Sequence, residues 1–267
     1  MTNAQAVANS YILSLLVLMI LSCSQSTENP PTYFGSVKIE VVDAPAALNE
    51  FKITLNRVEF HRSDASSELG WRVVSDESQS FNLLQLRNGI HLTIANKDVA
   101  AGSYDKIKVV FGAVTVRKED NIERLVTFTP AVVNGLVLDF SFSIFESQTY
   151  QLMFDFDASR SVKEVTLNQF VFNPIIRIQP TLQSGTISGS ISPPSAAAIV
   201  MTTVKGDTVT TYADTSALNG SFQLVALPSS VYAVRIVPGI PSLRETTITG
   251  VFVTVQRDTS IGQIVLH

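Results

Sequence analysis

The stretch GSVKIEVVDAPAALNEFKITLNRVEFHR, residues 35–62, decides the fold class because its apolar residues recur at every second position. The alternation runs through residues 37–41 and again through 51–55, and Val58 and Phe60 continue it. A period of two places alternate side chains on opposite faces of an extended chain. The stretch therefore predicts two β-strands, each with one face in a hydrophobic core.

The same pattern continues along the chain in short runs that are bounded by Gly, Asp, Asn or Pro. Hydrophobic residues make up 45% of the sequence, and many are Val, Ile and Leu interleaved with Thr and Ser, a composition typical of half-buried strands. Strands at this spacing predict an all-β sandwich or barrel. The further runs are 71–74, 81–86, 107–111, 114–116, 125–128, 136–142 and 150–156, with Asn88-Gly89 either closing a hairpin or capping a short helix.

A second set of alternating runs begins after residues 181–184. The segment GTISGSI at 185–191 is followed by similar runs up to Leu266. We therefore expect two tandem β-sandwich-like domains, at residues 35–180 and 184–267. Each is of ordinary domain size.

The amino-terminal segment predicts export. Residues 11–21, YILSLLVLMIL, form an apolar run that is too short to cross a bilayer comfortably, and Cys23, the single cysteine, follows it. This arrangement resembles the lipobox of bacterial lipoproteins, although the preceding residues contain no Lys or Arg. The resemblance implies a signal peptide at 1–22 and a diacylglycerol group on Cys23. The alternative is an uncleaved leader that contains a chance cysteine.

Two features refine this prediction. Residues 23–34 are polar and include Pro30-Pro31, which fits an extended tether between a lipid anchor and a folded body. Ser24 occupies the position where an aspartate would favour retention in the inner membrane of a diderm bacterium. We therefore expect a cell-envelope protein that is attached by its N-terminal lipid, in the outer membrane.

Charge and cysteine content exclude some classes of protein. The chain has 19 Lys and Arg against 23 Asp and Glu, a net charge of −4 without long runs of one sign, which disfavours a nucleic-acid partner. With one cysteine the chain has no internal disulfide, so apolar burial must stabilise the fold.

Several motifs in the first predicted domain resemble one bacterial family. They are GSVKIEVVDAP at 35–45, ITLNRVEFHR at 53–62, FNLLQLRNG at 81–89, AGSYDKI at 101–107 and LMFDFDASRS at 152–161. Their order and spacing resemble the domain-of-unknown-function family 4382 over residues 35–180. The resemblance implies a secreted or lipid-anchored β-domain, and the family brings no established catalytic residues.

The second predicted domain resembles the carboxypeptidase-regulatory-like domains. These are seven-stranded sandwiches of the transthyretin type that bacterial surface proteins use as spacers or modules. The resemblance covers residues 184–267, and it departs from the family pattern where Ser229-Ser230-Val231 precedes Tyr232 in place of the usual glycine.

No catalytic motif is found in the sequence. The HExxH and GxSxG patterns are absent, and the histidines are His61, His91 and His267. We expect His61 to be an exposed strand residue near a turn, because it alternates with the apolar Phe60. An enzyme would require acidic residues that converge in a cleft, and Asp155 with Glu146 or Glu164 is the best such set. We therefore expect a protein that is not an enzyme.

Asp155 and Asp157 are the acidic pair of most interest. They are two residues apart in a strand-like run, so both carboxylates point to the same side of the strand. Two hard oxygen ligands could begin a calcium site, with Asp43 or Asp139 as a further ligand. The alternative is that these aspartates cap the following turn, with Arg160 as a counter-charge.

These observations favour a non-enzymatic, lipid-anchored protein of the cell envelope. We expect it to bind an extracellular glycan or protein ligand, or a matrix polymer. The alternative is a structural or assembly component of an envelope complex, which an exposed apolar edge strand would favour.

Overall fold

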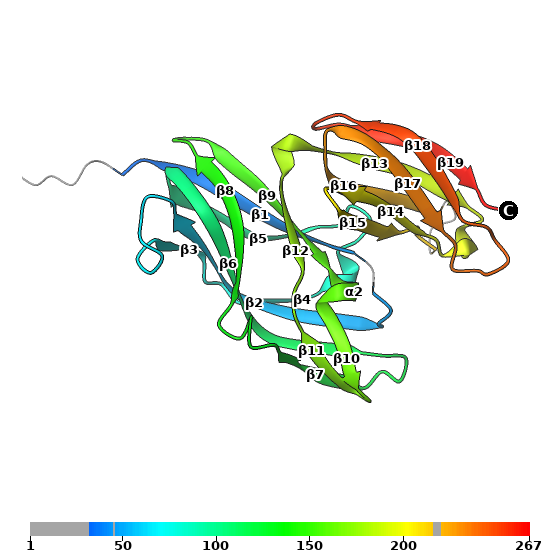
Figure 1. Cartoon of the computed structure of the whole chain (residues 1–267), viewed down its shortest axis with the longest axis horizontal. Helices are drawn as coiled ribbons and strands as arrows, with labels where there is room; N and C mark the ends of the chain where they lie inside the picture. The colour runs from blue at the N-terminus through cyan, green and yellow to red at the C-terminus, as the bar shows by residue number, and fades with distance from the viewer. Residues whose placement is uncertain (1–31, 45, 216–219) are drawn as a thin grey trace, which may run out of the picture. The chain divides into compact units, whose positions relative to one another are not determined.

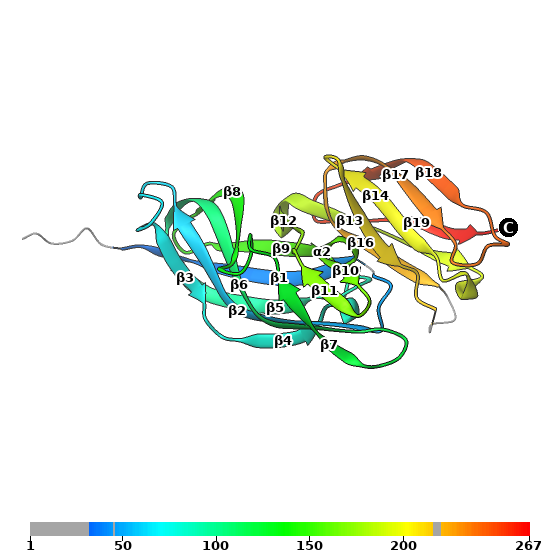
Figure 2. The same cartoon turned by 60° about the horizontal axis from the view of Figure 1, so that its bottom comes forward.

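The computed structural model describes residues 32–44, 46–215 and 220–267, and these residues form an all-β fold (Figures 1 and 2). The all-β prediction is therefore confirmed. The predicted signal peptide and Cys23 lie outside the described residues. Among the described segments, no helix has the length and apolar character needed to cross a membrane.

The first sandwich, β1–β12, packs a four-stranded sheet against a larger one. The four-stranded sheet has the order β12-β9-β1-β5, and the larger sheet has the order β10-β11-β7-β6-β2-β3, with β4 paired to β2 and β8 to β6. The bounds are β1 Phe34–Ala44, β2 Glu50–Arg62, β3 Trp71–Ser75, β4 Gln79–Asn82, β5 Leu92–Ala100, β6 Gly102–Arg117, β7 Glu123–Phe128, β8 Leu136–Ile144, β9 Thr149–Asp157, β10 Val162–Thr166, β11 Gln169–Phe172 and β12 Ile176–Pro180.

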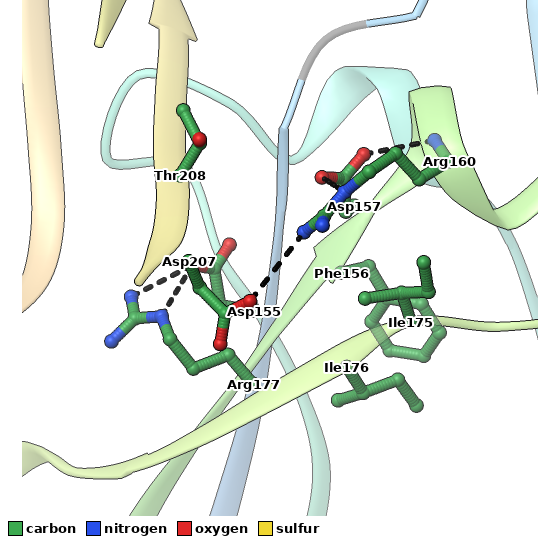
Figure 3. Close-up of a pocket in the computed structure, with 9 residues that line it drawn as sticks. All are labelled: Asp155, Phe156, Asp157, Arg160, Ile175, Ile176, Arg177, Asp207 and Thr208. Carbon is green, nitrogen blue, oxygen red and sulfur yellow. Dashed lines mark hydrogen bonds and ion pairs between the residues drawn. The ribbon is translucent and has the colours of Figure 1, made fainter. Parts of the chain in front are cut away.

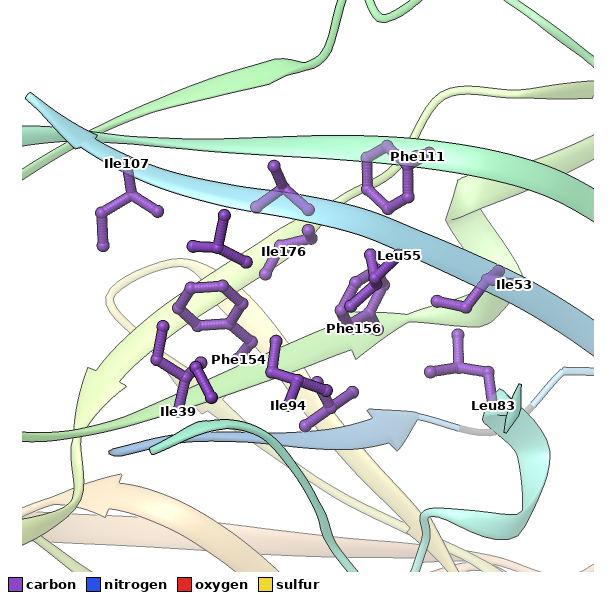
Figure 4. Close-up of a cluster of buried hydrophobic side chains, with 14 of the residues drawn as sticks. Ile39, Ile53, Leu55, Leu83, Ile94, Ile107, Phe111, Phe154, Phe156 and Ile176 are labelled. Atoms are coloured by element: carbon purple, nitrogen blue, oxygen red, sulfur yellow. The ribbon is translucent and has the colours of Figure 1, made fainter. Parts of the chain in front are cut away.

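The core of this sandwich lies between its two sheets (Figure 4). Ile39 and Phe154, from the four-stranded sheet, and Ile53 and Ile107, from the larger sheet, have no solvent exposure. Their positions follow from the alternation in the sequence, because every second side chain of a strand faces the same layer. At roughly 25 cal/mol per Å² of apolar surface removed from water, these side chains supply most of the stabilisation of the sandwich.

Bulges explain why the alternation of core-facing and outward-facing residues changes within the two longest strands. The apolar core residues of β2 shift from odd to even positions between Leu55 and Val58, and the pairing with β6 changes register between Leu55 and Arg57. A bulge inserts an extra residue and so moves the following side chains to the opposite face. The predicted runs 107–111 and 114–116 are for the same reason parts of one strand, β6, which bulges between Phe111 and Val114.

The second sandwich, β13–β19, has its own hydrophobic core, built from residues 187–266. Its sheets have the orders β16-β13-β19 and β15-β14-β17-β18, so its described strands number seven, as the resemblance to carboxypeptidase-regulatory-like domains implies. The assignment to that family stays a prediction. The bounds are β13 Ser184–Ser192, β14 Ile199–Val204, β15 Asp207–Tyr212, β16 Ser221–Pro228, β17 Ser230–Val237, β18 Thr246–Val253 and β19 Asp258–Val265.

Short helical turns connect these strands. The turn η1, Leu83–Gln85, is followed by Asn88 and Gly89, which both have positive φ angles of 59° and 82°. Asn88-Gly89 therefore forms a left-handed turn after a short helix. The other turns are α2 Ala158–Ser161, η2 Thr181–Gln183 at the predicted domain boundary, and η3 Pro194–Ala196.

Candidate functional site

The predicted acidic pair lies at the end of β9, and each carboxylate is matched by an arginine (Figure 3). Asp155 Oδ2 accepts hydrogen bonds from Nη2 and Nε of Arg177, on β12, at 2.7 and 3.2 Å. Asp157 is the N-cap of α2. It accepts from the backbone amide of Arg160 at 2.9 Å, and its Oδ2 lies 2.5 Å from Arg160 Nε. The capping alternative is therefore the arrangement that the structure shows for Asp157.

The space beside these residues is small. Asp155, Arg160, Arg177 and Asp207 help to line a cavity of about 40 Å³, which has room for a few water molecules but not for an ordinary organic ligand. Burial raises the pKa of the Asp155 carboxyl, and its ion pair with Arg177 opposes that shift. Arg177 Nη1 also donates to the carbonyl of Ala226 at 2.7 Å, so the cluster links β12 to β16.

The other predicted partners of this pair take part in different interactions. Glu164 accepts from Lys118 at 2.9 Å, and Asp139 is on β8, opposite Lys106. Glu146 lies in the turn before β9, about 25–30 Å along the chain from Asp155, given the rise of a strand. Asp43 accepts from the first amide of α2, that of Ala158, at 3.2 Å. Neither Glu146 nor Glu164 is among the residues that line the cavity at Asp155.

The calcium prediction for Asp155 and Asp157 gains no third ligand. Within 32–44, 46–215 and 220–267, no three His, Cys, Asp or Glu side chains are grouped so that they could hold a metal ion. A cation at Asp155 and Asp157 would also have to compete with the guanidinium groups of Arg177 and Arg160. Calcium binding at this pair stays a prediction.

The expectation for His61 was wrong. Its ring is buried, with 3% exposure, because the loop between β2 and β3 covers this face of β2. His61 Nδ1 lies 2.7 Å from Asp105 Oδ1, and Nε2 lies 3.0 Å from the carbonyl oxygen of Ser66. This hydrogen bond lowers the pKa of the Asp105 carboxyl. A side chain at Gly70 would overlap the His61 ring, so the ring packs tightly against this loop and supports it.

A larger site that the sequence did not predict lies on the sheet β16-β13-β19. This polar groove has a volume of about 510 Å³ and is largely open to solvent. Its walls present hydroxyl and amide groups, with one buried phenylalanine ring beneath them. It is lined by Asn88, Ser188, Gly189, Ser190, Ser221, Phe222, Gln223, Ser260, Gly262 and Gln263.

Hydrogen bonds position the groups at two margins of the groove. At one margin, Asn88 Nδ2 donates to the carbonyl of Ser221 at 3.1 Å, and its backbone amide donates to Thr211 Oγ1 at 3.2 Å. The Oδ1 atom of Asn88 is buried and has no hydrogen-bond partner in the described part of the chain. At the other margin, Ser188 Oγ donates to Asp258 Oδ2 at 2.5 Å. The result is a surface of fixed donors and acceptors.

Gly89 allows the loop after η1 to reach this groove. The φ of 82° at Gly89 favours glycine, and a Cβ there would lie 2.1 Å from Gln223 Oε1, so the Gln223 side chain would have to move. The sequence does contain the corresponding signal. The segments SGTISGS at 184–190 and SIGQ at 260–263 place small polar residues on the outer face of paired strands.

Chemically, the groove suits a ligand that is rich in hydroxyl groups. Serine hydroxyls donate and accept, and Asn and Gln side chains offer both an N–H₂ donor and a C=O acceptor. None of the lining residues is charged, so ion pairing would not drive binding. Shape and hydrogen bonding would have to supply the affinity.

Among solved structures, the chain is similar to a minor pilin of Streptococcus agalactiae, with 10% identity over 86% of this chain and 94% of that one and a TM-score of 0.24. It is also similar to the major pilin subunit BcpA of Bacillus cereus, with 9% identity, coverage of 88% and 70%, and a TM-score of 0.22. A putative adhesin of Bacteroides ovatus gives 10% identity, coverage of 90% and 95%, and a TM-score of 0.19. These similarities are too low to indicate a shared function.

No curated protein matches the chain. A family model does match, over residues 34–174, and its bounds agree closely with the first sandwich. The matched segment includes the β1, β2 and β9 motifs and covers more than half of the chain. The chain therefore belongs to the family described as "Domain of unknown function (DUF4382)".

Proposed function

We propose that this protein is a non-enzymatic, lipid-anchored component of the bacterial cell envelope that binds a hydroxyl-rich ligand, a glycan, in the polar groove. The lipobox-like run that ends at Cys23 supports the anchor, and Ser24 supports the outer membrane as its location.

The observation on which the ligand proposal depends is the polar groove itself. It is more than ten times as large as the cavity at Asp155, about 510 Å³ against about 40 Å³, and its lining is uncharged. The amides of Gln223, on β16, and Gln263, on β19, line this surface from different strands. A glycan offers hydroxyl groups that match such donors and acceptors.

A glycan array tests this proposal. The mature protein, purified in detergent, would be screened in calcium and again in chelator. Ser260→Trp fills the groove from an exposed position, and Thr247→Trp, also exposed but on β18, is the matched control. We expect glycan hits for the wild type and Thr247→Trp that Ser260→Trp loses. Hits that survive Ser260→Trp would exclude the groove, and hits that depend on calcium would support the metal prediction at Asp155 and Asp157.

A second candidate function is assembly within an envelope complex. The strand β18 lies at the edge of its sheet and pairs only with β17 in the sheet order β15-β14-β17-β18. Phe252 and Val231 are cross-strand partners on its outer face, with 57% and 61% exposure. An exposed apolar pair at a sheet edge is a site where another chain can dock. A blank glycan array together with cross-linking of a Phe252→Cys variant to a second protein would favour this candidate.

A further inference from the structure

Four apolar side chains are exposed around the point where the described chain begins. They are Tyr33 and Phe34, each with 54% exposure, Phe145 with 63% and Leu182 with 48%; we call them the N-terminal patch. Figure 1 shows β1 beginning near the turn that joins β8 to β9. Single exposed apolar residues are ordinary on protein surfaces, but a group of large ones marks an interaction site.

Backbone contacts hold these residues together. The amide of Ser147 donates to the carbonyl of Phe34 at 3.0 Å, and the amide of Ala101 donates to the carbonyl of Tyr33 at 2.8 Å. Gly35 packs so closely against the β8–β9 turn that a Cβ there would lie 2.3 Å from the Phe145 carbonyl oxygen. The start of β1 is thus fixed beside Phe145.

Phe145 and Leu182 also share a cavity. Together with Tyr150 and Pro180 they line a space of about 190 Å³, which is smaller than a typical ligand pocket. Its lining includes two aromatic rings, a proline ring and a leucine side chain beside the amides of Gln148 and Gln151. An apolar cavity with polar groups at its edge suits the membrane interface, where lipid headgroups meet acyl chains.

The length of the chain before the N-terminal patch indicates what the patch contacts. The nine residues 24–32 separate Cys23 from Tyr33, and fully extended they reach at most about 35 Å. If Cys23 carries lipid, this end of the first sandwich cannot leave the vicinity of the bilayer, whatever conformation those residues adopt. Because this link is short, the patch also stays close to the membrane surface, which favours contact between them.

We propose that the N-terminal patch inserts into the interfacial region of the bilayer that holds the Cys23 lipid, an inference that rests on the lipid anchor of the proposed function. The Tyr33 ring suits this region because its apolar body enters the acyl boundary while its hydroxyl stays hydrated, and the two Phe rings add apolar contact area. Glu146 lies next to Phe145 beside the patch, and the patch itself contains no lysine or arginine, so apolar burial drives the contact. The contact would orient the first sandwich and leave its far end exposed.

Quenching by brominated lipid tests this contact. Glu146→Cys introduces a labelling site beside the patch without removing its aromatic rings, and Cys23 itself is blocked by lipid. Ser242→Cys, in the loop between β17 and β18, is the control label, because that loop is at the opposite end of β17 from η2. The lipidated full-length protein would be reconstituted into phosphatidylcholine vesicles with brominated acyl chains. We expect quenching at position 146 and little at 242.

Substitutions then test the aromatic side chains. Phe34→Ser with Phe145→Ser should abolish most of the quenching at position 146. Leu125→Ser should leave it unchanged, because Leu125 is 73% exposed but lies on β7, which pairs with the far end of β6. Equal quenching at 146 and 242 in reconstituted protein would overturn the patch and leave the anchor intact. A protein whose mass shows no lipid at Cys23 would overturn both proposals.

Discussion

The two sandwiches contain the same kind of tyrosine hydrogen bond, although their sequences differ. In the first, the hydroxyl of Tyr104 donates to the carbonyl of Ala100 at 2.6 Å; in the second, the hydroxyl of Tyr232 donates to the carbonyl of Pro228 at 2.7 Å. Both tyrosines thus bond a carbonyl four residues earlier, at the turn into their strand. Gly102 has a φ of 142° in the first turn, whereas serines fill the second. The tyrosine corner therefore requires the hydroxyl and its spacing, but not glycine.

The cores behind these corners differ. In the first sandwich the rings of Phe60 and Phe142 meet edge to face at 4.9 Å, and Tyr104 stacks on Phe142 at 5.4 Å. The buried cluster of the second is aliphatic except for Phe222 and Tyr232, among the described residues. Aromatic pairs add about 0.5–1.5 kcal/mol beyond the area they bury. We therefore expect the two sandwiches to differ in how much stability each loses when a core ring is removed.

The largest expected effect is from removing a core ring. Phe60→Ala should destabilise the first sandwich by about 3–5 kcal/mol, because it leaves a cavity and removes two ring contacts. Phe222→Ala is the matched change in the second sandwich, where the ring packs against Gly189. Calorimetry should show each variant lowering one transition and leaving the other. A single cooperative transition that both variants lower equally would show that the sandwiches do not fold separately.

The next effect concerns the link between the sandwiches. Arg177→Met leaves the Asp155 carboxylate buried without its partner and removes the donor to Ala226, so we expect a loss of about 3–5 kcal/mol. Urea titration gives the stability, and limited proteolysis should cut faster near residues 181–184. Adding Asp155→Leu to Arg177→Met should recover much of the loss, since no unpaired charge remains. No recovery would mean that the arginine stabilises mainly through its contact with β16.

A smaller effect tests the shared corner. Tyr104→Phe and Tyr232→Phe each remove one hydrogen bond and keep the ring, so each should cost about 1 kcal/mol in its own sandwich. Burial raises the pKa of both hydroxyls, which keeps them protonated as donors at neutral pH. Chemical denaturation with a probe in each sandwich gives the two values. A neutral result at either tyrosine would show that its corner is a by-product of packing.

The smallest effect is a pH dependence that is confined to the first sandwich. Arg124 and the amide of Ile122 hold the pKa of Asp120 at about 2, below its ordinary 3.8. The folded state therefore binds this proton less tightly than the unfolded state, so the contribution is present above pH 3.8 and lost as pH falls through 2. Asp120→Asn should flatten the melting temperature of the first sandwich between those values. An unchanged slope would mean that other carboxylates control it.

Much of the fold could be predicted from the sequence because strand alternation is a local property. The buried faces of β1 and β2 follow directly from residues 37–41 and 51–55. The fusion of 107–111 and 114–116 into β6 could not be predicted, since a bulge depends on the partner strand. The alternation at Phe60 also predicted an exposed His61, but a loop eight residues long covers that face.

The candidate sites show the same limit. The spacing of Asp157 and Arg160 predicted the cap on α2 as the alternative to a calcium site, because these groups are neighbours in sequence. Arg177, which pairs with Asp155 from 22 residues further along, becomes a neighbour only through the pairing of β9 with β12. The polar groove combines three strands and the loop after η1. Its small polar residues are far apart in the sequence, so they could not be recognised as one site before the sheet was known.

The mass of the mature protein tests the central claim most directly. The protein would be extracted from the bacterial envelope fraction and its amino-terminal peptide analysed by mass spectrometry. We predict a chain that begins at Cys23 and carries a diacylglycerol group, and a Cys23→Ala variant that leaves the membrane fraction. A chain that retains residues 1–22, or an unmodified Cys23 in protein that still sediments with membranes, would contradict the lipid-anchored account.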